Sequence, residues 1–234
     1  SGHFLVAQFE VFVRLRMFEE RLNPEDATKA VIADNLYGLE IDPRCTQIAA
    51  FNLALAAWKF AGKYFVLPEM NLACSGLAPQ GKKEDWIKLA GGDNSLRQGM
   101  EYLYSTFQNS SFLGSLIEPN RFEDELDFFN YEELLPLLDK AILFEEDDSN
   151  FEEIERGVAA KGIAVAGKLL SKRYTLQITN VPYLARGKQS KELADYCQTN
   201  FPFSKSDLAT VFLERMLKNT HNNCTLSLVL PQNW

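Results

Sequence analysis

Histidine is scarce and cysteine is scattered in this chain of 234 residues. The two histidines are His3 and His221, and the four cysteines lie far apart, without the closely spaced pairs of a zinc site. We therefore expect no metal centre. Scattered cysteines are typical of reduced thiols, which predicts a cytoplasmic protein.

Long apolar runs are also absent. No run approaches the roughly 18 residues of a membrane-spanning helix, and Glu10, Arg14 and Arg16 interrupt the apolar residues at 1–18. This segment matches neither a signal peptide nor a membrane helix. With 46% hydrophobic and 24% charged residues, the composition predicts a soluble globular protein with no membrane partner.

The chain has fewer basic than acidic residues, and its formal net charge is −8. The deficit is local: residues 118–156 contain 15 acidic and 3 basic residues, whereas the remainder contains 17 acidic and 21 basic residues. The acidic run is typical of a solvated helix face. Since the rest is only mildly basic, we expect any strong nucleic-acid-binding surface to lie outside this chain.

Strand and helix patterns alternate near the N-terminus. Apolar residues at 4–17 have helical spacing without a start signal, which predicts that the chain begins inside a larger protein. Residues 23–26 are typical of a turn. A strand at 35–41, a helix that starts at Asp42-Pro43 and a strand at 70–74 predict a parallel sheet with a crossover helix.

The alternation stops in the middle of the chain and then resumes. Between 79 and 170 the spacing predicts helices at 122–140 and about 150–170. A strand at 174–179, a helix after Ser206-Asp207, a turn at 219–223 and a strand at 225–230 follow. The pattern predicts an α/β fold with a doubly wound sheet and a mostly helical insertion.

Two short segments have the chemistry of a nucleotide site. Glu40, at the end of the first predicted strand, has the position of an acid that accepts from both hydroxyls of a ribose, and Ile41 would then pack on an adenine. The alternative is an ordinary strand-to-helix turn with Asp42 as its capping acid. The small residues Ser1 and Gly2 let a nucleotide approach the backbone closely, or they are simply where the chain is cut.

The segment Asn180-Val181-Pro182-Tyr183 follows an apolar strand and is suited to grip a planar base. The amide oxygen of Asn180 and a neighbouring backbone carbonyl can both accept from one amino group. Pro182 stiffens the turn, and Tyr183 offers a flat face for stacking. A segment this short also arises by chance as a common turn.

Basic residues follow this turn. Arg186, Lys188, Lys191 and Lys205 have the charge to contact phosphates, although scattered surface lysines are the ordinary alternative.

Taken in order, these segments resemble the N6-adenine DNA methyltransferases, and most closely the large proteins of restriction–modification and phage-defence systems. The resemblance implies a class I, Rossmann-like fold and S-adenosylmethionine as cofactor. The family's cofactor loop, Asp-Pro-x-Cys-Gly-Ser-Gly-x-Phe-Leu, is represented only by its tail, Ser1 to Leu5. The residues that the resemblance assigns to cofactor binding are Ser1, Gly2, Phe4, Glu40, Ile41, Cys74 and Ser75. The acid often found beside the last two is absent.

The family's catalytic Asn-Pro-Pro-Tyr falls on Asn180, Val181, Pro182 and Tyr183, with valine in place of the first proline. Val181 still provides a backbone carbonyl at this position. The resemblance implies methyl transfer to the N6 amine of an adenine flipped out of duplex DNA, with Arg186 and Lys188 on the DNA. Two rivals stay open: a methyltransferase acting on RNA or on a protein amide, and a catalytically incomplete interaction module.

The resemblance also implies a domain order. Residues 1–78 correspond to the cofactor-binding half without its first strand, 79–171 to a mostly helical insertion, and 172–234 to the catalytic half, truncated before any target-recognition region. We therefore expect double-stranded DNA to bind mainly through regions outside this chain. We also expect other restriction or defence subunits as partners, and the alternative is a fragment that is inactive on its own.

Overall fold

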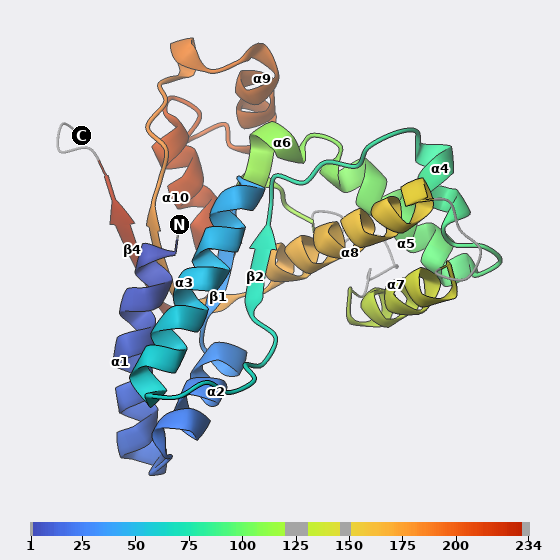
Figure 1. The fold of residues 1–234 in the computed structure, drawn as a ribbon. Coiled ribbons are helices and arrows are strands. Elements are labelled where there is room, and N and C mark those ends of the chain that lie inside the picture. Colours follow the sequence, from blue (N-terminus) through green and yellow to red (C-terminus); the bar gives the residue numbers. More distant parts are fainter. Residues whose placement is uncertain (1, 120–130, 146–150, 231–234) are drawn as a thin grey trace. The chain divides into compact units, whose positions relative to one another are not determined.

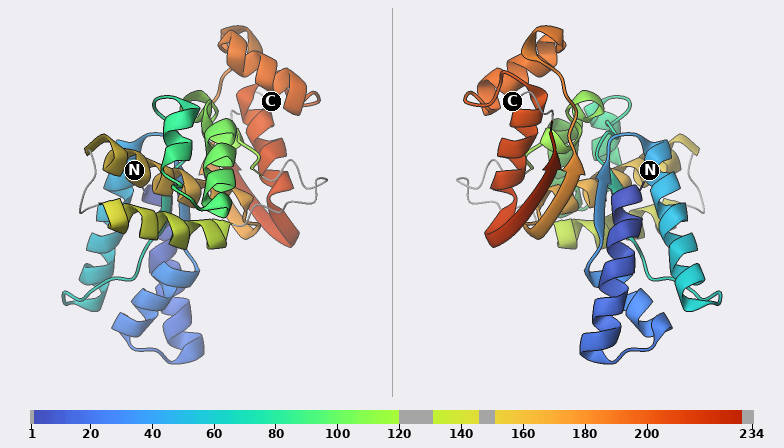
Figure 2. Two further views of the ribbon diagram at one scale, coloured as in Figure 1. Left: turned by 90° about the vertical axis from the view of Figure 1, so that its right-hand side faces the viewer. Right: turned by 90° about the vertical axis from the view of Figure 1, so that its left-hand side faces the viewer.

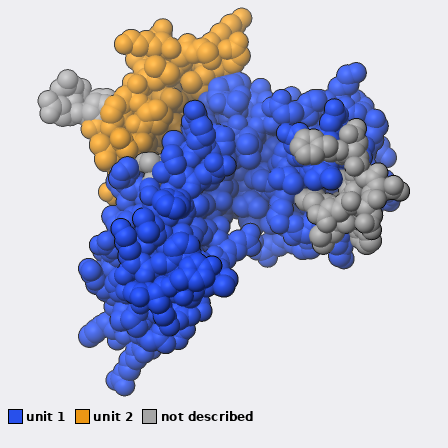
Figure 3. All heavy atoms as spheres, viewed as in Figure 1, with its two compact units in different colours: residues 1–170 blue, residues 171–234 orange. Residues whose placement is uncertain are grey.

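The computed structural model describes residues 2–119, 131–145 and 151–230. The chain divides into two compact units, residues 1–170 and 171–234, which are coloured separately in Figure 3. Each unit contains a pair of parallel strands. The structure therefore shows an α/β protein that is mostly helical with two small sheets, and it does not show a single doubly wound sheet.

The first unit begins with three helices around one pair of strands. Helices α1 (His3–Glu20), α2 (Pro24–Asp34) and α3 (Pro43–Ala61) accompany strands β1 (Tyr37–Glu40) and β2 (Asn71–Cys74). The strands are parallel and α3 connects them, as the sequence predicted. Figure 1 and the two turned views of Figure 2 show α1 and α3 lying side by side.

Local capping explains where two of these helices begin. Asp42 accepts from the backbone N–H of Arg44, and Pro43 occupies the first turn of α3. Asn23 caps α2 in the same way by accepting from the N–H of Asp26. The prediction of a plain turn at 23–26 was therefore wrong: these residues cap and start a helix. An apolar core holds the helices together, and its members include Phe9, Val13, Val31, Ile32, Leu53 and Ala57.

The described part of residues 79–170 is mostly helical, as expected, although the spacing predicted helices only at 122–140 and about 150–170. It contains α4 (Lys83–Lys88), α5 (Asn94–Phe107), α6 (Ser110–Leu113), a 3₁₀ turn η1 (Gly114–Leu116), α7 (Tyr131–Glu145) and α8, which runs to the unit boundary (Phe151–Ser171). Part of the helix predicted at 122–140 lies outside the described residues. Trp86 is fully buried, and its indole N–H donates to the carbonyl of Gln80 at 2.7 Å.

The second unit pairs β3 (Tyr174–Asn180) with β4 (Thr220–Val229) in parallel. Between the strands lie the 3₁₀ turn η2 (Arg186–Lys188), α9 (Lys191–Asn200) and α10 (Leu208–Lys218). The predicted turn at 219–223 is instead the irregular start of β4, where the register shifts and Asn223 has φ 65°. Asparagine tolerates this left-handed conformation better than most residues, so the strand continues through it.

The sequence interpretation also missed α9. Its polar sequence has few apolar positions with helical spacing, but Ser190 accepts from the N–H of Leu193 and was a readable start signal. Among the described residues, no helix is both long and apolar enough to cross a membrane.

Candidate functional site

The carboxyl ends of β1 and β2 bring four of the predicted cofactor residues together. Glu40 and Cys74 are paired in the register of the two strands. The N–H of Ser75 donates to the Glu40 carbonyl at 2.8 Å, and the Cys74 thiol donates to the Ile41 carbonyl over 3.3 Å. Glu40, Ile41, Cys74 and Ser75 therefore form one local cluster at the end of the sheet.

The acids of this cluster have different partners. The Asp42 carboxylate accepts from the Arg44 guanidinium at 2.8 Å, and that hydrogen bond lowers the pKa of Asp42 to about 2. Asp42 is thus committed to capping α3. The Glu40 carboxylate accepts from the N–H of Ile41 at 2.9 Å, which holds it at the strand end. Burial raises the pKa of the Cys74 thiol, so this side chain stays protonated near neutral pH.

Two glycines enclose Ile41. A Cβ atom on Gly76 would lie 2.1 Å from the Ile41 carbonyl oxygen, and one on Gly114 would lie 3.0 Å from Ile41 Cδ1. Ile41 itself is 45% exposed. A Cβ atom would therefore clash with Ile41 at Gly76 and crowd it at Gly114, while part of the isoleucine stays open to a ligand.

Sequence reasoning missed Gly114 and its neighbour. The hydroxyls of Ser115 and Ser75 lie 3.3 Å apart, which ties η1 to the end of β2. Ser75-Gly76 carried a visible turn signal, whereas Gly114 lies in the helical segment, far along the chain from Ile41. No local pattern marks such a contact.

Gly2 has φ 80° and precedes α1, where a Cβ atom would lie 2.8 Å from Ala49 Cα on α3. Its backbone thus allows a close approach of two helices, a structural reason for glycine at this position. Phe4 follows on α1 and is 43% exposed. The predicted cofactor residue Ser1 lies outside the described residues.

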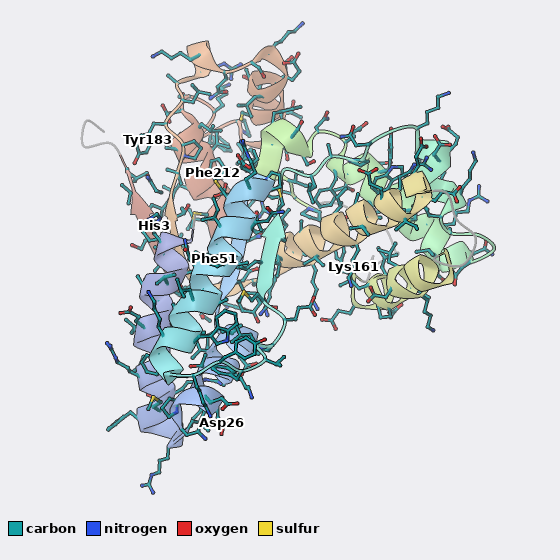
Figure 4. The ribbon with its side chains drawn as sticks, in the orientation of Figure 1. His3, Asp26, Phe51, Lys161, Tyr183 and Phe212 are labelled. Carbon is teal, nitrogen blue, oxygen red and sulfur yellow. The ribbon has the colours of Figure 1, made fainter. Side chains whose placement is uncertain are left out.

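The predicted catalytic segment lies where β3 ends. Asn180 is paired with Val229 of β4 and is exposed, so its side chain does not point into the core. The Tyr183 hydroxyl lies 3.0 Å from Asn180 Oδ1 and 2.9 Å from the Val229 carbonyl oxygen. Figure 4 labels Tyr183 in this unit. The structure thus brings together an amide, an aromatic ring and a strand end.

The two central residues of the segment have opposite environments. Val181 is 3% exposed, whereas Pro182 is exposed. A buried valine anchors the turn through its apolar side chain, which gives a physical role to the residue in place of the first proline. Tyr183 is 47% exposed, so part of this residue is accessible to a ligand.

The Asn180 amide oxygen keeps accepting capacity. A carbonyl-type oxygen has two lone pairs, and the single hydrogen of the Tyr183 hydroxyl is shared with Val229. Asn180 Oδ1 can therefore accept a further hydrogen bond from a ligand amine. The hydroxyl also fixes the direction of that oxygen, which lowers the ordering cost when a ligand binds.

The predicted phosphate contacts lie directly after this segment. Lys188 is exposed, and Arg186 is half-buried with an Nη1 atom that has no hydrogen-bond partner among the described residues. The backbone here is fixed: the N–H of Arg186 donates to the Ser206 carbonyl, and the N–H of Leu208 to the Leu184 carbonyl, both at 3.0 Å. Residues 2–119, 131–145 and 151–230 hold no group of three or more histidine, cysteine or acidic residues arranged for a metal ion.

Comparison with known proteins gives a family and two curated relatives. The model of the Eco57I restriction-modification methylase family matches residues 34–234. The adenine-specific methyltransferase PglX of Lacticaseibacillus casei (strain Zhang) is 27% identical over 237 residues, covering 100% of the chain and 19% of that protein. The adenine-specific methyltransferase BrxX of Escherichia coli O9:H4 (strain HS) is 24% identical over 260 residues, covering 100% and 20%. The chain therefore spans about one fifth of the length of these relatives.

Proposed function

This chain belongs to the Eco57I restriction-modification methylase family, and from that premise we propose that it forms the core of an enzyme that methylates N6 of adenine in DNA. S-adenosylmethionine is the proposed methyl donor. The observation that carries the proposal is the geometry of Asn180 and Tyr183 at the end of β3, because an exposed amide oxygen and an accessible ring suit an extruded adenine. The names of both relatives support adenine as the acceptor.

The residues at the end of β1 and β2 fit the proposed cofactor. Glu40 is placed to accept from ribose hydroxyls, and the open part of Ile41 suits an adenine ring. The close glycines Gly76 and Gly114 leave the backbone around Ile41 free of side chains. Cys74 and Ser75 hold this backbone in place through their bonds to the neighbouring strand end. S-adenosylmethionine, when bound, supplies a methyl group on a positively charged sulfur.

Asn180 and Val181 are proposed to activate the adenine amine. That amine is a poor nucleophile because its lone pair is delocalised into the ring. The Asn180 side-chain oxygen and the Val181 backbone carbonyl would accept its two hydrogens and favour the positive charge that develops on nitrogen. No strong base is needed, since the proton leaves after transfer.

Tyr183 is proposed to hold the extruded base. Taking an adenine out of the stack costs about a few kcal/mol, and stacking on an exposed aromatic face recovers part of it. The Tyr183 ring is accessible, while its hydroxyl is bound at the edge to Val229. That bond engages the hydroxyl and not the ring atoms that would stack on the base. Arg186 and Lys188 would then contact the DNA backbone.

The proposal includes a doubly wound, class I fold. The parallel pairing within each unit and the crossover helix α3 support it. It also includes duplex DNA and other restriction or defence subunits as partners, which the family name supports.

The decisive experiment replaces Asn180 with alanine in the full-length protein. Radiolabelled methyl transfer to DNA should fall by orders of magnitude, because one of the two acceptors for the amine is lost. Calorimetry should show unchanged binding of S-adenosylmethionine. Asn35→Ala is the matched control, since Asn35 is an exposed asparagine in the first unit. Near-normal turnover of the Asn180 variant would refute the assignment.

The same assay separates the rivals. Label in RNA or protein, with none in DNA, would favour a methyltransferase of another substrate class. Absence of both methyl transfer and cofactor binding in the wild-type protein would favour an interaction module.

A further inference from the structure

Phe203 is the most exposed large apolar side chain of the described residues, at 96% exposure. It lies between α9 and α10, on the stretch that connects them. A single exposed apolar residue is common on protein surfaces. Phe203 differs in two ways: hydrogen bonds fix the backbone next to it, and other hydrogen bonds join its turn to residues 184–186.

The turn around Phe203 is fixed on both sides. Phe201 is fully buried, and the N–H of Ser204 donates to the Phe201 carbonyl at 3.2 Å. The Ser204 hydroxyl donates to Glu214 at 2.6 Å, and the Thr210 hydroxyl donates to the Ser204 carbonyl at 2.6 Å. Hydrogen bonds thus hold the backbone beside Phe203, so its side chain is the main part that must be ordered when it inserts into a partner.

This turn is bonded to the proposed catalytic loop. Backbone hydrogen bonds join Leu184 to Leu208 and Arg186 to Ser206, and an isolated antiparallel bridge pairs Ala185 with Asp207. The first of these residues follows Tyr183 directly. Phe203 therefore belongs to the same framework as the segment that would receive the extruded adenine.

The charge of this framework favours a polyanion. Residues 184–208, which include the bonded partners named above, contain four basic and three acidic residues, in a chain whose net charge is −8. The four basic residues are Arg186, Lys188, Lys191 and Lys205, and none forms an ion pair with a carboxylate of the described residues. A projecting apolar group in a segment that carries four basic residues suits duplex DNA, whose phosphates flank apolar base stacks.

We propose that Phe203 is a wedge that inserts between base pairs of duplex DNA beside the adenine to be methylated. The inference rests on the proposed function, and it assigns to this residue the opening of the base stack. Phenylalanine wedges unstack a base step and kink the duplex. Opening the step lowers the cost of extruding the neighbouring adenine, and Lys188 and Lys205 hold the phosphates around it.

The first test measures DNA unwinding, which needs no methyl transfer. A nicked circular plasmid is sealed by ligase in the presence of the full-length protein, and the topoisomers are then separated on a gel. The wild type and Phe18→Ala should unwind the plasmid, whereas Phe203→Ala should lose at least about half of the shift, as expected when a wedge is removed. Phe18 is the matched control because it is 85% exposed and lies on α1. Phe203→Leu, which keeps an apolar wedge, should retain most of the unwinding.

The second test measures methyl transfer. For Phe203→Ala, kcat/KM on a fully paired duplex should fall about 10- to 100-fold, the range that loss of a base-stacking aromatic gives. The defect should shrink when the target adenine stands opposite a mismatched base, because such a base costs less to extrude.

The outcomes separate the two proposals. Suppose that the wild type unwinds DNA, that Phe203→Ala does not, and that the wild type transfers no methyl group. This result would support the wedge and refute the proposed function. Normal methylation with equal unwinding by Phe203→Ala and the wild type would overturn the wedge and leave the proposed function standing. A wild type that does not unwind DNA, or a Phe203→Ala defect limited to binding another protein, would also overturn the wedge.

Discussion

Replacing Tyr183 with phenylalanine removes one hydroxyl and keeps the ring that would stack on the adenine. In the structure this hydroxyl lies 3.0 Å from Asn180 Oδ1 and 2.9 Å from the Val229 carbonyl oxygen. It therefore has two roles that the ring does not share. It directs the Asn180 amide, and it anchors the edge of the ring to β4.

The size of the effect follows from the exposure of these groups. Asn180 is exposed and Val229 is 50% exposed as a residue, so we expect water to replace the lost donor. The cost is then that of an ordinary hydrogen bond, about 0.5–1.5 kcal/mol, without the penalty of a buried orphan. We expect kcat/KM for methyl transfer to fall about 2- to 12-fold, the same energy expressed as a rate. The loss should appear mainly in kcat, because the amide is misdirected while DNA still binds.

The assay is steady-state transfer of a radiolabelled methyl group to DNA, with urea unfolding measured in parallel. Tyr64→Phe is the control, since Tyr64 is 76% exposed and its hydroxyl has no hydrogen-bond partner among the described residues. Tyr183→Ala should lose considerably more activity than Tyr183→Phe, because stacking disappears as well. A Tyr183→Phe enzyme with wild-type kcat would refute the role given to the hydroxyl. A loss equal to that of Tyr183→Ala would refute the role given to the ring.

Two further changes test the first unit. Gly76→Ala should destabilise the protein by about 1–3 kcal/mol, typical of overpacking, and weaken S-adenosylmethionine binding, because the new Cβ would lie 2.1 Å from the Ile41 carbonyl oxygen. Thermal unfolding measures this, with Gly92→Ala as the control because a Cβ atom at Gly92 meets open space. Equal melting temperatures for the two variants would contradict the prediction. Glu25 bonds to two lysines, which lower its pKa from 4.5 to about 2. A depressed carboxyl pKa contributes stability that is present above pH 4.5 and lost as pH falls through about 2. The stability difference between the wild type and Glu25→Gln should therefore vanish toward pH 2 in chemical denaturation, and a difference that grows on acidification would refute this linkage.

The strands and the starts of α3 and α10 could be predicted from the sequence. The start of α3 at Asp42-Pro43 and the strand that ends at Asn180 both depend on neighbouring residues, so the pattern contained them. Helices α2 and α9 were missed although Asn23 and Ser190 cap them. In both cases the cap was a local signal that the interpretation did not use, and apolar residues of each helix, Val31 in α2 and Leu193 in α9, are buried.

The candidate site was only partly predictable. Residues Glu40, Ile41, Cys74 and Ser75 meet because parallel strands place their carboxyl ends together, which follows from the strand–helix–strand order. The placement of Gly114 against Ile41 had no sequence signal, because the two residues lie far apart in the chain and no repeat links them. The exposure of Phe203 was equally hidden, since it depends on how the turn before α10 is bonded.

The amino-acid order alone determined which chemistry is present: an acid after one strand, and an amide, a proline and an aromatic ring after another. These features involve residues a few positions apart, where geometry follows from backbone preferences and caps. Tertiary structure alone decided that the Tyr183 hydroxyl is bonded to Val229, 46 residues away, and that Val181 is buried while Asn180 stays open. Such contacts depend on strand pairing and on packing across the fold, where small differences among many weak interactions select one arrangement.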